Sequence, residues 1–263
     1  MSKNFVIILN YNGADYTIKC IDSLLKIPSL LKIVVVDNNS SDNSILLIKR
    51  KFPWIAVIKN DVNLGFAAGN NVGINYALRN GAGSVLLLNN DTLCLGSIKK
   101  LFENNGDIVG PVLEFKKANE MIYDLGGHVN WWLGRTTHEE TDSKNNISRR
   151  KPDYISGAAL LVKRNVFEKV GLLDERYFLY YEDADFCVRA KKAGFNVVLE
   201  SHVYVHHVLG ASLGRKNLFI LYHNLRSNLI FIVKNLEWYK KPIGFVYWLC
   251  LVFKVFLNLF LGK

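Results

Sequence analysis

Apolar runs alternate with amphipathic segments along the first ninety residues. Four short apolar runs predict buried strands, at Phe5–Leu9, Leu31–Val36, Ile55–Lys59 and Val85–Leu88. Apolar residues at helical spacing between them predict helices, at Tyr16–Leu25, Ile45–Lys51 and Gly69–Arg79. Strands that alternate with helices in this way form parallel βαβ units with right-handed crossovers. The pattern therefore predicts an α/β fold whose mostly parallel sheet is flanked by helices.

The second half of the chain continues this pattern less regularly. It predicts two more strands, a helical turn and a helix, at Ser156–Lys163, Asn196–Leu199, Val166–Val170 and Asp183–Ala193. The polar stretch Gly126–Arg150 predicts an irregular, exposed excursion. Two apolar helical segments close the chain, at Leu218–Leu236 and Pro242–Leu261. We therefore expect one α/β domain over residues 1–214 and a helical appendage over residues 215–263.

Positive charge is concentrated in the tail. The formal net charge is +10, and residues 202–263 hold eight Lys or Arg against one acid, Glu237, which leaves +7 in the tail. A basic surface can bind nucleic acid or an anionic membrane. Because the basic residues here are interleaved with long apolar and aromatic runs, a bilayer surface is favoured over nucleic acid.

Three interpretations are open for Pro242–Leu261. Its twenty mostly apolar residues can span a bilayer, but Lys254 would then lie in the span, where a charge is costly. A helix in the interface, with Lys240, Lys241 and Lys254 reaching the headgroups, avoids that cost and is favoured. The third interpretation is a buried contact in a soluble protein or an oligomer.

Polar residues follow three of the predicted strands, at Asn10–Gly13, Asp37–Asp42 and Asn89–Asp91. Ligands of parallel α/β sheets bind at the carboxyl ends of the strands, so three such ends suggest a site. Asp37 can accept hydrogen bonds from a nucleotide base or ribose, or form an Asx-turn. The loop Asn63–Asn71 can bring backbone amides to a phosphate at a helix N-terminus, or serve only as a tight turn.

Two further groups of residues suggest chemistry. Asp91 offers hard oxygen ligands to Mg²⁺ or Mn²⁺, and a neutral imidazole from His206 or His207 can complete the metal shell. Glu182, Asp183 and Asp185 are three acids within four residues, which repel one another unless a metal, an arginine or a reacting proton uses them. The alternative is an acidic first helical turn, in which Asp185 pairs with Arg189.

In order, the segments VIILNYNG, VVVDNNSSDNS, NLGFAAGNN, LLLNNDT, SGAALLVKR, GLLDERYFLYYEDADFCVRAKKAGF and VYVHHVLGAS closely resemble a family 2 glycosyltransferase. The resemblance runs from Val6 to Ser212 and is greatest to the rhamnosyltransferases of cell-surface polysaccharide synthesis. It implies a GT-A fold, a nucleoside-diphosphate sugar donor, a divalent metal and inversion at the anomeric carbon.

The resemblance also implies roles for individual residues. Asp91 corresponds to the metal-binding acid of a DXD-like motif whose first acid is replaced by Asn89, and His207 matches a histidine that can join the metal, with His206 as the second choice. Glu182-Asp183 matches the ED motif, in which Asp183 takes the place of the general base. The donor contacts that we expect are Asn10, Tyr11, Asn12, Asp37, Asn63, Gly65, Asn70 and Asn90.

The expected function is therefore transfer of rhamnose from dTDP-rhamnose to a lipid-linked saccharide at the cytoplasmic face of the cell membrane. A UDP-hexose donor and a membrane-docked partner without turnover are the alternatives. A sugar-phosphate nucleotidyltransferase is disfavoured, because no glycine-rich basic loop follows the first strand. Trp131, Trp132 and Asp185 are candidate acceptor contacts, with core packing as the alternative for the two tryptophans.

Overall fold

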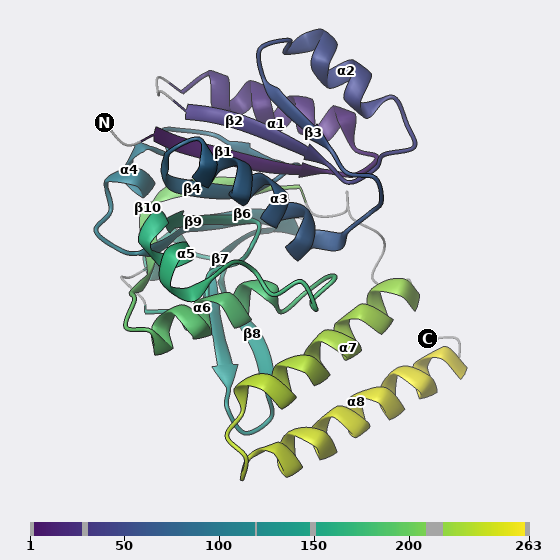
Figure 1. Cartoon of the computed structure of the whole chain (residues 1–263). Coiled ribbons are helices and arrows are strands. Elements are labelled where there is room, and N and C mark those ends of the chain that lie inside the picture. The colour runs from purple at the N-terminus through teal and green to yellow at the C-terminus, as the bar shows by residue number, and fades with distance from the viewer. Residues whose placement is uncertain (1–2, 28–30, 119, 148–150, 209–217, 261–263) are drawn as a thin grey trace.

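The computed structural model describes residues 3–27, 31–118, 120–147, 151–208 and 218–260, which form a ten-stranded sheet with helices on both faces (Figure 1). Eight strands follow the order β3-β2-β1-β4-β9-β6-β10-β5, and β7 and β8 extend from β6. The strands are β1 (Lys3–Asn10), β2 (Leu31–Asp37), β3 (Ala56–Lys59), β4 (Ala82–Asn89), β5 (Thr92–Cys94), β6 (Ile108–Lys117), β7 (Glu120–Asn130), β8 (Arg135–Thr141), β9 (Ala159–Lys163) and β10 (Val197–His207).

The helices fall largely where the apolar spacing predicts them. They are α1 (Ala14–Leu25), α2 (Ser44–Lys51), α3 (Gly65–Arg79), α4 (Lys99–Glu103), α5 (Arg164–Val170), α6 (Glu182–Lys192), α7 (Leu218–Asn235) and α8 (Lys241–Phe260), with a short 3₁₀ turn η1 (Lys144–Asn146). The last residue of the expected helix Pro242–Leu261 and the expected domain boundary at residue 214 lie outside the described residues.

The first four strands confirm the predicted βαβ units. Strand β1 pairs in parallel with β2 and β4, and β2 pairs in parallel with β3. Alternate residues of each strand enter two separate cores, as the pleat of a strand requires. Ile7 and Leu87 pack on the α3 side, whereas Ile8 and Leu86 pack on the α1 side. The sheet is thus buried on both faces, which explains the unbroken apolar runs in the sequence.

Helix α3 begins four residues before the predicted start. Gly65, Gly69 and Gly73 repeat at a spacing of four, so they lie on one helix face. A Cβ atom on Gly69 would stand 2.7 Å from Leu9 Cδ1, and one on Gly73 would stand 2.4 Å from Ile7 Cγ2. The glycines therefore let α3 lie directly against β1 and bring its N-terminus to the carboxyl ends of the strands.

The prediction of an irregular excursion is wrong for residues 126–141, and its last residues, 148–150, lie outside the described residues. Strands β7 and β8 form a long antiparallel hairpin with a register shift between Asp124 and Gly127. The Tyr154 ring lies against this part of the hairpin and leaves no room for a side chain at Gly127, where a Cβ would lie 2.2 Å from the ring. One face of the hairpin is exposed and polar, and the paired glycines interrupt its alternation. For these reasons the sequence pattern looks like a loop.

The second half of the sheet is more mixed than the first. Strand β9 runs antiparallel to β4 and β6, and β10 runs parallel to β6. The sequence pattern missed β6 altogether, and the strand predicted at Asn196–Leu199 continues to His207. This extension contains His202, His206 and His207, and it carries the last two toward the carboxyl ends of the neighbouring strands.

The C-terminal helices form an antiparallel pair at the edge of the α/β body (Figure 1). Helix α7 belongs to this body, because Ser227, Asn228, Phe231 and Ile232 are buried. Helix α8 packs on α7 and is otherwise open: the stretch Lys241–Asn258 is long and apolar enough to cross a membrane, and only 6% of it is buried.

Candidate active site

The first polar cluster lies where β1 and β2 end side by side. Asn10 and Asp37 are register partners, and the Asn10 amide donates to Asp37 Oδ2 at 2.8 Å. Ser40 donates to the same carboxylate through its hydroxyl at 2.7 Å and its backbone N–H at 2.9 Å. Asn10 and Asp37 are both fully buried. Their side chains therefore hold the two loops together, and the donor contact expected of them stays a prediction.

The turn after β1 presents exposed neighbours of this pair. Asn12 has a left-handed backbone (φ +50°), and its backbone N–H donates to Ser40 Oγ at 2.9 Å. Its side-chain oxygen accepts from the Ser41 backbone N–H at 2.8 Å, which fixes this turn against the second loop. Tyr11 is half exposed beside it. Strained backbone of this kind is concentrated at functional sites in proteins, and an asparagine tolerates it better than most residues.

Amide side chains also fix the N-terminus of α3. Asn38 donates to the Gly65 carbonyl at 2.8 Å, and Asn63 accepts from the Gly65 backbone N–H at 3.0 Å. Gly65 has φ +77°, and a Cβ there would lie 2.5 Å from the Phe178 carbonyl, so only glycine fits. The predicted donor residue Asn70 is buried and donates to the Phe66 carbonyl within the helix.

Asp91 and His207 meet as the sequence predicts. Asp91 follows β4, His207 ends β10, and His207 Nε2 lies 3.1 Å from Asp91 Oδ1. The backbone N–H of Val208 donates to the Asp91 carbonyl at 2.8 Å and fixes the two segments together. His206 points to the other face of the strand, with Nδ1 3.7 Å from Glu114 Oε1. The structure thus favours His207 over His206.

The Asp91–His207 pair fits a divalent cation held by few protein ligands. Both side chains are largely buried, and together they offer oxygen and nitrogen ligands that suit Mn²⁺ or Mg²⁺. Over the described ranges, no three His, Cys, Asp or Glu side chains gather as a metal group. A cation here would complete its shell with water and with the phosphates of a bound nucleotide. Asn90 lies beside this pair and donates to Thr17 Oγ1 at 3.2 Å.

The segment before β9 connects this pair with the acids of α6. Ala158 accepts a hydrogen bond from the Asn89 backbone N–H at 2.9 Å, and the Gly157 backbone N–H donates to Asp183 Oδ2 at 2.8 Å. The Ala184 backbone N–H donates to Asp183 Oδ1 at 2.7 Å. Asp183 and the Asn89–Asp91 turn are therefore both fixed to the same short segment, Gly157-Ala158.

Glu182 and Asp183 have different surroundings. Burial, and then the Asp183 charge, raise the pKa of Glu182 well above its usual value, and Glu182 Oε2 has no hydrogen-bond partner among the described residues. Burial also raises the pKa of Asp183, but the Gly157 amide and the His138 charge oppose this rise. Two adjacent carboxyls with little access to water do not both ionise readily. Glu182 therefore holds a proton more readily, and Asp183 is the more readily ionised of the two.

The sequence pattern missed His138, which lies on the β7–β8 hairpin. Its Nδ1 atom is 2.8 Å from Asp124 Oδ2. Burial alone would lower the pKa of His138, but the hydrogen bond and charge of Asp124, together with the Asp183 charge, raise it. His138 thus gains a proton more readily than an ordinary histidine, and its charge when protonated acts on Asp183. Its signal is hidden in the sequence, because it depends on pairing between two strands of the hairpin.

Two consecutive left-handed residues precede α6. Tyr180 (φ +68°) and Tyr181 (φ +70°) turn the chain directly before Glu182. Such a conformation is unfavourable for an aromatic residue and needs support from its surroundings. Helix α7 gives that support: Asn228 donates to the Tyr181 hydroxyl at 3.0 Å, and Ser227 donates to the Leu179 carbonyl at 2.8 Å.

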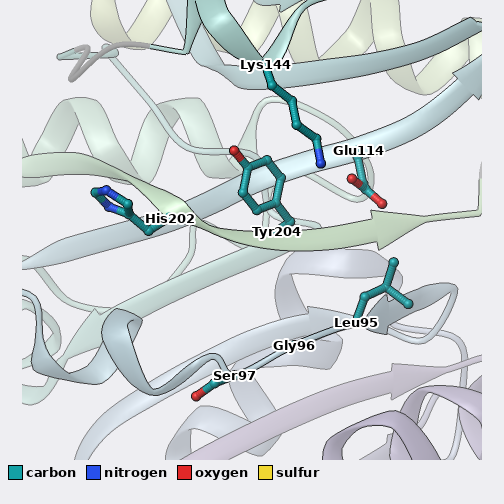
Figure 2. Close-up of a pocket in the computed structure, with 7 residues that line it drawn as sticks. All are labelled: Leu95, Gly96, Ser97, Glu114, Lys144, His202 and Tyr204. Atoms are coloured by element: carbon teal, nitrogen blue, oxygen red, sulfur yellow. The ribbon is translucent and has the colours of Figure 1, made fainter.

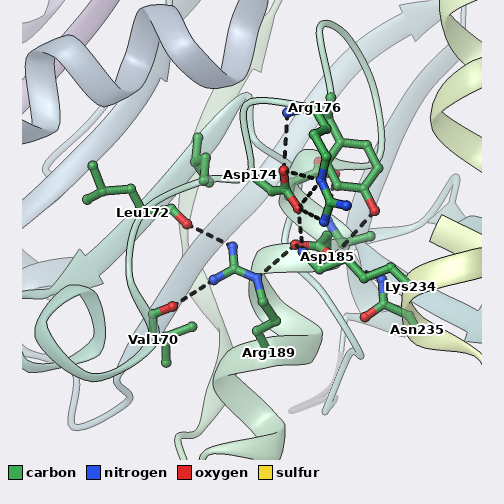
Figure 3. Close-up of polar contacts among 12 residues, drawn as sticks. Val170, Leu172, Asp174, Arg176, Asp185, Arg189, Lys234 and Asn235 are labelled. Atoms are coloured by element: carbon green, nitrogen blue, oxygen red, sulfur yellow. Dashed lines mark hydrogen bonds and ion pairs between the residues drawn. The ribbon is translucent and has the colours of Figure 1, made fainter. Parts of the chain in front are cut away.

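Asp185 is not brought into the site. It is fully buried and accepts from Arg189 Nε at 2.8 Å, from Lys234 Nζ at 2.8 Å and from Asn235 Nδ2 at 2.9 Å. Figure 3 shows Arg189 and Lys234 converging on it from α6 and α7. Its carboxylate forms ion pairs between α6 and α7 inside the protein. The structure therefore agrees with the predicted pairing with Arg189 and not with the expected contact to the acceptor.

Trp131 and Trp132 lie at the far tip of the β7–β8 hairpin. The Trp132 ring stands edge-on to Tyr239, with centroids 6.3 Å apart, and Lys240 Nζ lies 5.6 Å from its centre. Lys192 Nζ lies 5.9 Å from the centre of Trp131. The contacts of Trp132 join the hairpin tip to the turn between α7 and α8. Trp132 is thus placed with the C-terminal helices, whereas Trp131 is partly buried against the core of the α/β body, beside Lys192 of α6.

A separate pocket of about 290 Å³ opens beside β10 (Figure 2). Lys144 reaches over the Tyr204 ring, with Nζ 4.8 Å from its centre. The lining residues are Leu95, Gly96, Ser97, Glu114, Lys144, His202 and Tyr204. None of the residues expected to bind the donor lines it, so this pocket is distinct from the cluster described above.

The sequence profile of glycosyl transferase family 2 matches residues 5–171. The chain belongs to this family. It is 32% identical over 202 residues to a low-salt glycan biosynthesis hexosyltransferase of Haloferax volcanii, covering 73% of this chain and 62% of that protein. It is 25% identical over 266 residues to the N-acetylglucosaminyl-diphospho-decaprenol L-rhamnosyltransferase of Mycobacterium tuberculosis, covering 90% of this chain and 87% of that protein. The expected likeness to rhamnosyltransferases is confirmed.

The fold is also confirmed. A mannosyltransferase of Pyrobaculum calidifontis, solved with GDP-Man and Mn²⁺, superposes with a TM-score of 0.61 at 17% identity, over 98% of this chain and 70% of that one. At this identity the likeness establishes the GT-A architecture alone. The curled sheet flanked by helices is thus the arrangement of a GT-A domain.

Proposed function

We propose that this chain transfers a sugar from a nucleoside-diphosphate donor to a hydroxyl of a saccharide acceptor, with inversion. Asp183 carries the proposal: it is a partly buried carboxylate with a raised pKa, fixed by the Gly157 and Ala184 amides, and joined through one loop to the Asn89–Asp91 turn. A base in such a place can accept the proton of a hydroxyl as that oxygen attacks.

The reaction would proceed as a single displacement. The acceptor oxygen forms a bond to the anomeric carbon and loses its proton to Asp183, while the bond from that carbon to the diphosphate oxygen breaks. Asp91 and His207 would hold Mg²⁺ or Mn²⁺, whose charge would stabilise the departing diphosphate. Tyr11 and Asn12, together with the α3 N-terminus that Asn63 and Gly65 shape, are the surfaces we propose for the nucleotide.

The donor that we propose first is dTDP-rhamnose, from which rhamnose is transferred, and a UDP-hexose is the second candidate. The Mycobacterium tuberculosis relative is named for L-rhamnosyl transfer to a diphospho-decaprenol-linked sugar, which supports both the donor and a lipid-linked acceptor. We accordingly propose action at the cytoplasmic face of the cell membrane in surface polysaccharide synthesis, with residues 1–214 as the catalytic unit and residues 215–263 as the membrane-associating region.

Nucleotide binding and turnover test this proposal separately. Thermal shifts with dTDP, UDP and their sugars, with and without Mn²⁺, should show a metal-dependent shift that Asp91→Asn weakens. Asp183→Asn should keep the shift and lower transfer by about 10²- to 10⁴-fold, the usual contribution of a general base. Glu103→Gln, an exposed carboxylate on α4, serves as the control. Near-normal turnover of Asp183→Asn would overturn the base, and a wild-type protein that no nucleotide stabilises would overturn the donor site.

A further inference from the structure

Helix α8 presents an apolar stripe to the outside. Val246, Leu249, Phe253 and Phe256 are each more than half exposed, and their spacing of three or four residues places them on one helix face. A stripe of this length on a helix surface is unusual for a soluble monomer and marks a surface for a membrane or a protein partner. The choice between these partners depends on what borders the stripe.

Aromatic side chains from two distant parts of the sequence lie at one end of the stripe. Trp238 and Tyr239 come from the α7–α8 turn, and Trp132 comes from the tip of the β7–β8 hairpin. Trp238 is 82% exposed and Trp132 is 52% exposed. Amphipathic rings of this kind are enriched where protein meets the interface of a bilayer. We call Trp132, Trp238 and Tyr239 the aromatic cluster.

The charges around the stripe are those of a surface for anionic headgroups. Lys240 and Lys241 stand beside the aromatic cluster and Lys254 is exposed further along α8, while α8 contains no acid. Glu237, the acid of the turn, is paired with Lys240. Basic residues that flank an apolar helix face favour an anionic bilayer.

Packing indicates how α8 would meet the bilayer. The Trp248 indole donates to the Leu225 carbonyl at 2.9 Å, and a Cβ on Gly244 would lie 3.0 Å from Ile232, so α8 is fixed along α7 at two points. Helix α7 is in turn fixed to the α/β body, because Asn228 donates to the Gly134 carbonyl and Lys234 donates to Asp185. A spanning α8 would have to leave α7, whereas a helix lying in the bilayer plane keeps all these contacts.

We propose that the α8 stripe and the aromatic cluster form one surface that docks in the plane of an anionic phospholipid bilayer, with the tip of the β7–β8 hairpin inserted beside the helix. The proposal rests on the membrane action proposed above and names its contact surface. It assigns Trp132 to lipid rather than to the acceptor sugar, and it orients the catalytic domain by two points of attachment.

Vesicle co-sedimentation of the full chain tests this surface. Binding to phosphatidylglycerol-containing vesicles should exceed binding to pure phosphatidylcholine and fall at high salt. Trp132→Ala and Phe253→Ser should each weaken binding by about tenfold, since each removes an apolar anchor. Trp54→Ala is the matched control, because Trp54 is also exposed but lies between α2 and β3. Equal loss in Trp54→Ala and Trp132→Ala, or no vesicle binding by the wild type, would overturn the proposal.

The orientation of α8 has its own readout. Cys250 is exposed near the middle of α8, and Cys20, Cys94 and Cys187 are buried, so a fluorophore can be placed on Cys250 alone. Docking in the plane predicts quenching by headgroup-level quenchers. Quenching at the bilayer centre would mean a span and would overturn the in-plane arrangement. A dimer in light scattering that Phe253→Ser dissociates would assign the stripe to a second copy and overturn it as well.

A nucleotide thermal shift recorded on every variant separates the two proposals. Lost vesicle binding with a retained Mn²⁺-dependent shift concerns the docking surface alone. A wild-type protein that binds vesicles but shows no nucleotide shift supports the docking surface and counts against the donor site.

Discussion

Replacing Asp185 by asparagine tests whether this acid serves packing or chemistry. The substitution keeps the shape of the side chain but removes the charge that Arg189 and Lys234 share, each at 2.8 Å. Asp185 is fully buried, while Arg189 and Lys234 are 20% and 23% exposed. Breaking a buried ion pair costs about 3–5 kcal/mol, because the remaining charge loses its partner.

The lower end of that range applies here. Arg189 keeps its hydrogen bonds to the Val170 and Leu172 carbonyls, and Lys234 keeps Asp174 at 2.6 Å. We therefore expect Asp185→Asn to lower the free energy of unfolding by about 3 kcal/mol. For a chain of this size that corresponds to a melting temperature lower by roughly 6–12 °C.

Urea unfolding followed by tryptophan fluorescence measures this difference at neutral pH. Asp22→Asn is the matched control, since its carboxylate pairs with Lys51 on the surface, where an ion pair contributes about 0.5 kcal/mol. Nucleotide binding by Asp185→Asn should persist below its melting temperature. A variant within about 1 kcal/mol of the wild type that had nonetheless lost transfer would refute the packing role and restore Asp185 as an acceptor contact.

Two other perturbations probe the base and the donor loop. Because burial raises the pKa of Asp183, the transfer rate should fall on the acid side at a pH above the ordinary aspartate pKa of 3.8. His138→Gln removes a positive charge near Asp183 and should move this fall to higher pH. An unchanged pH–rate profile in that variant would contradict the reasoning. Gly65→Ala should cost about 1–3 kcal/mol in urea unfolding, through its left-handed backbone and the close Phe178 carbonyl. Gly171→Ala, with φ +82° and open space around it, measures the backbone part alone, so equal costs would exclude the clash.

The sequence predicts most of the nucleotide-binding half because its signals are local there. A strand buried on both faces gives an apolar run, and parallel topology brings the polar residues after β1, β2 and β4 to one edge. The meeting of Asp91 with a histidine could also be predicted from the residue types, and the family resemblance favours His207 over His206. The distance between Asp91 and His207 along the chain hides the contact, which depends on β10 returning beside β5.

The rest depends on contacts between segments that are distant in the sequence. The β7–β8 hairpin looks like a loop because one polar face and two glycines obscure its alternation, and the location of His138 is lost with it. Asp185 looks like an acceptor contact because the sequence groups it with Glu182 and Asp183. A helix places residues two apart on different faces, so Asp183 meets the Gly157 amide while Asp185 turns toward α7.

The placement of the C-terminal region depends most strongly on contacts between segments that are distant in the sequence. Hydropathy describes α8 by itself, so it allows a span, an interfacial helix or a buried helix, and only the charge of Lys254 favours the interface. What separates these is the partner of each face. Trp248 and Gly244 turn one face to α7, which leaves the opposite stripe and Lys254 to the outside. A helix fixed along its length to a domain that must stay in water has its apolar stripe parallel to a surface, which supports docking in the plane of the bilayer.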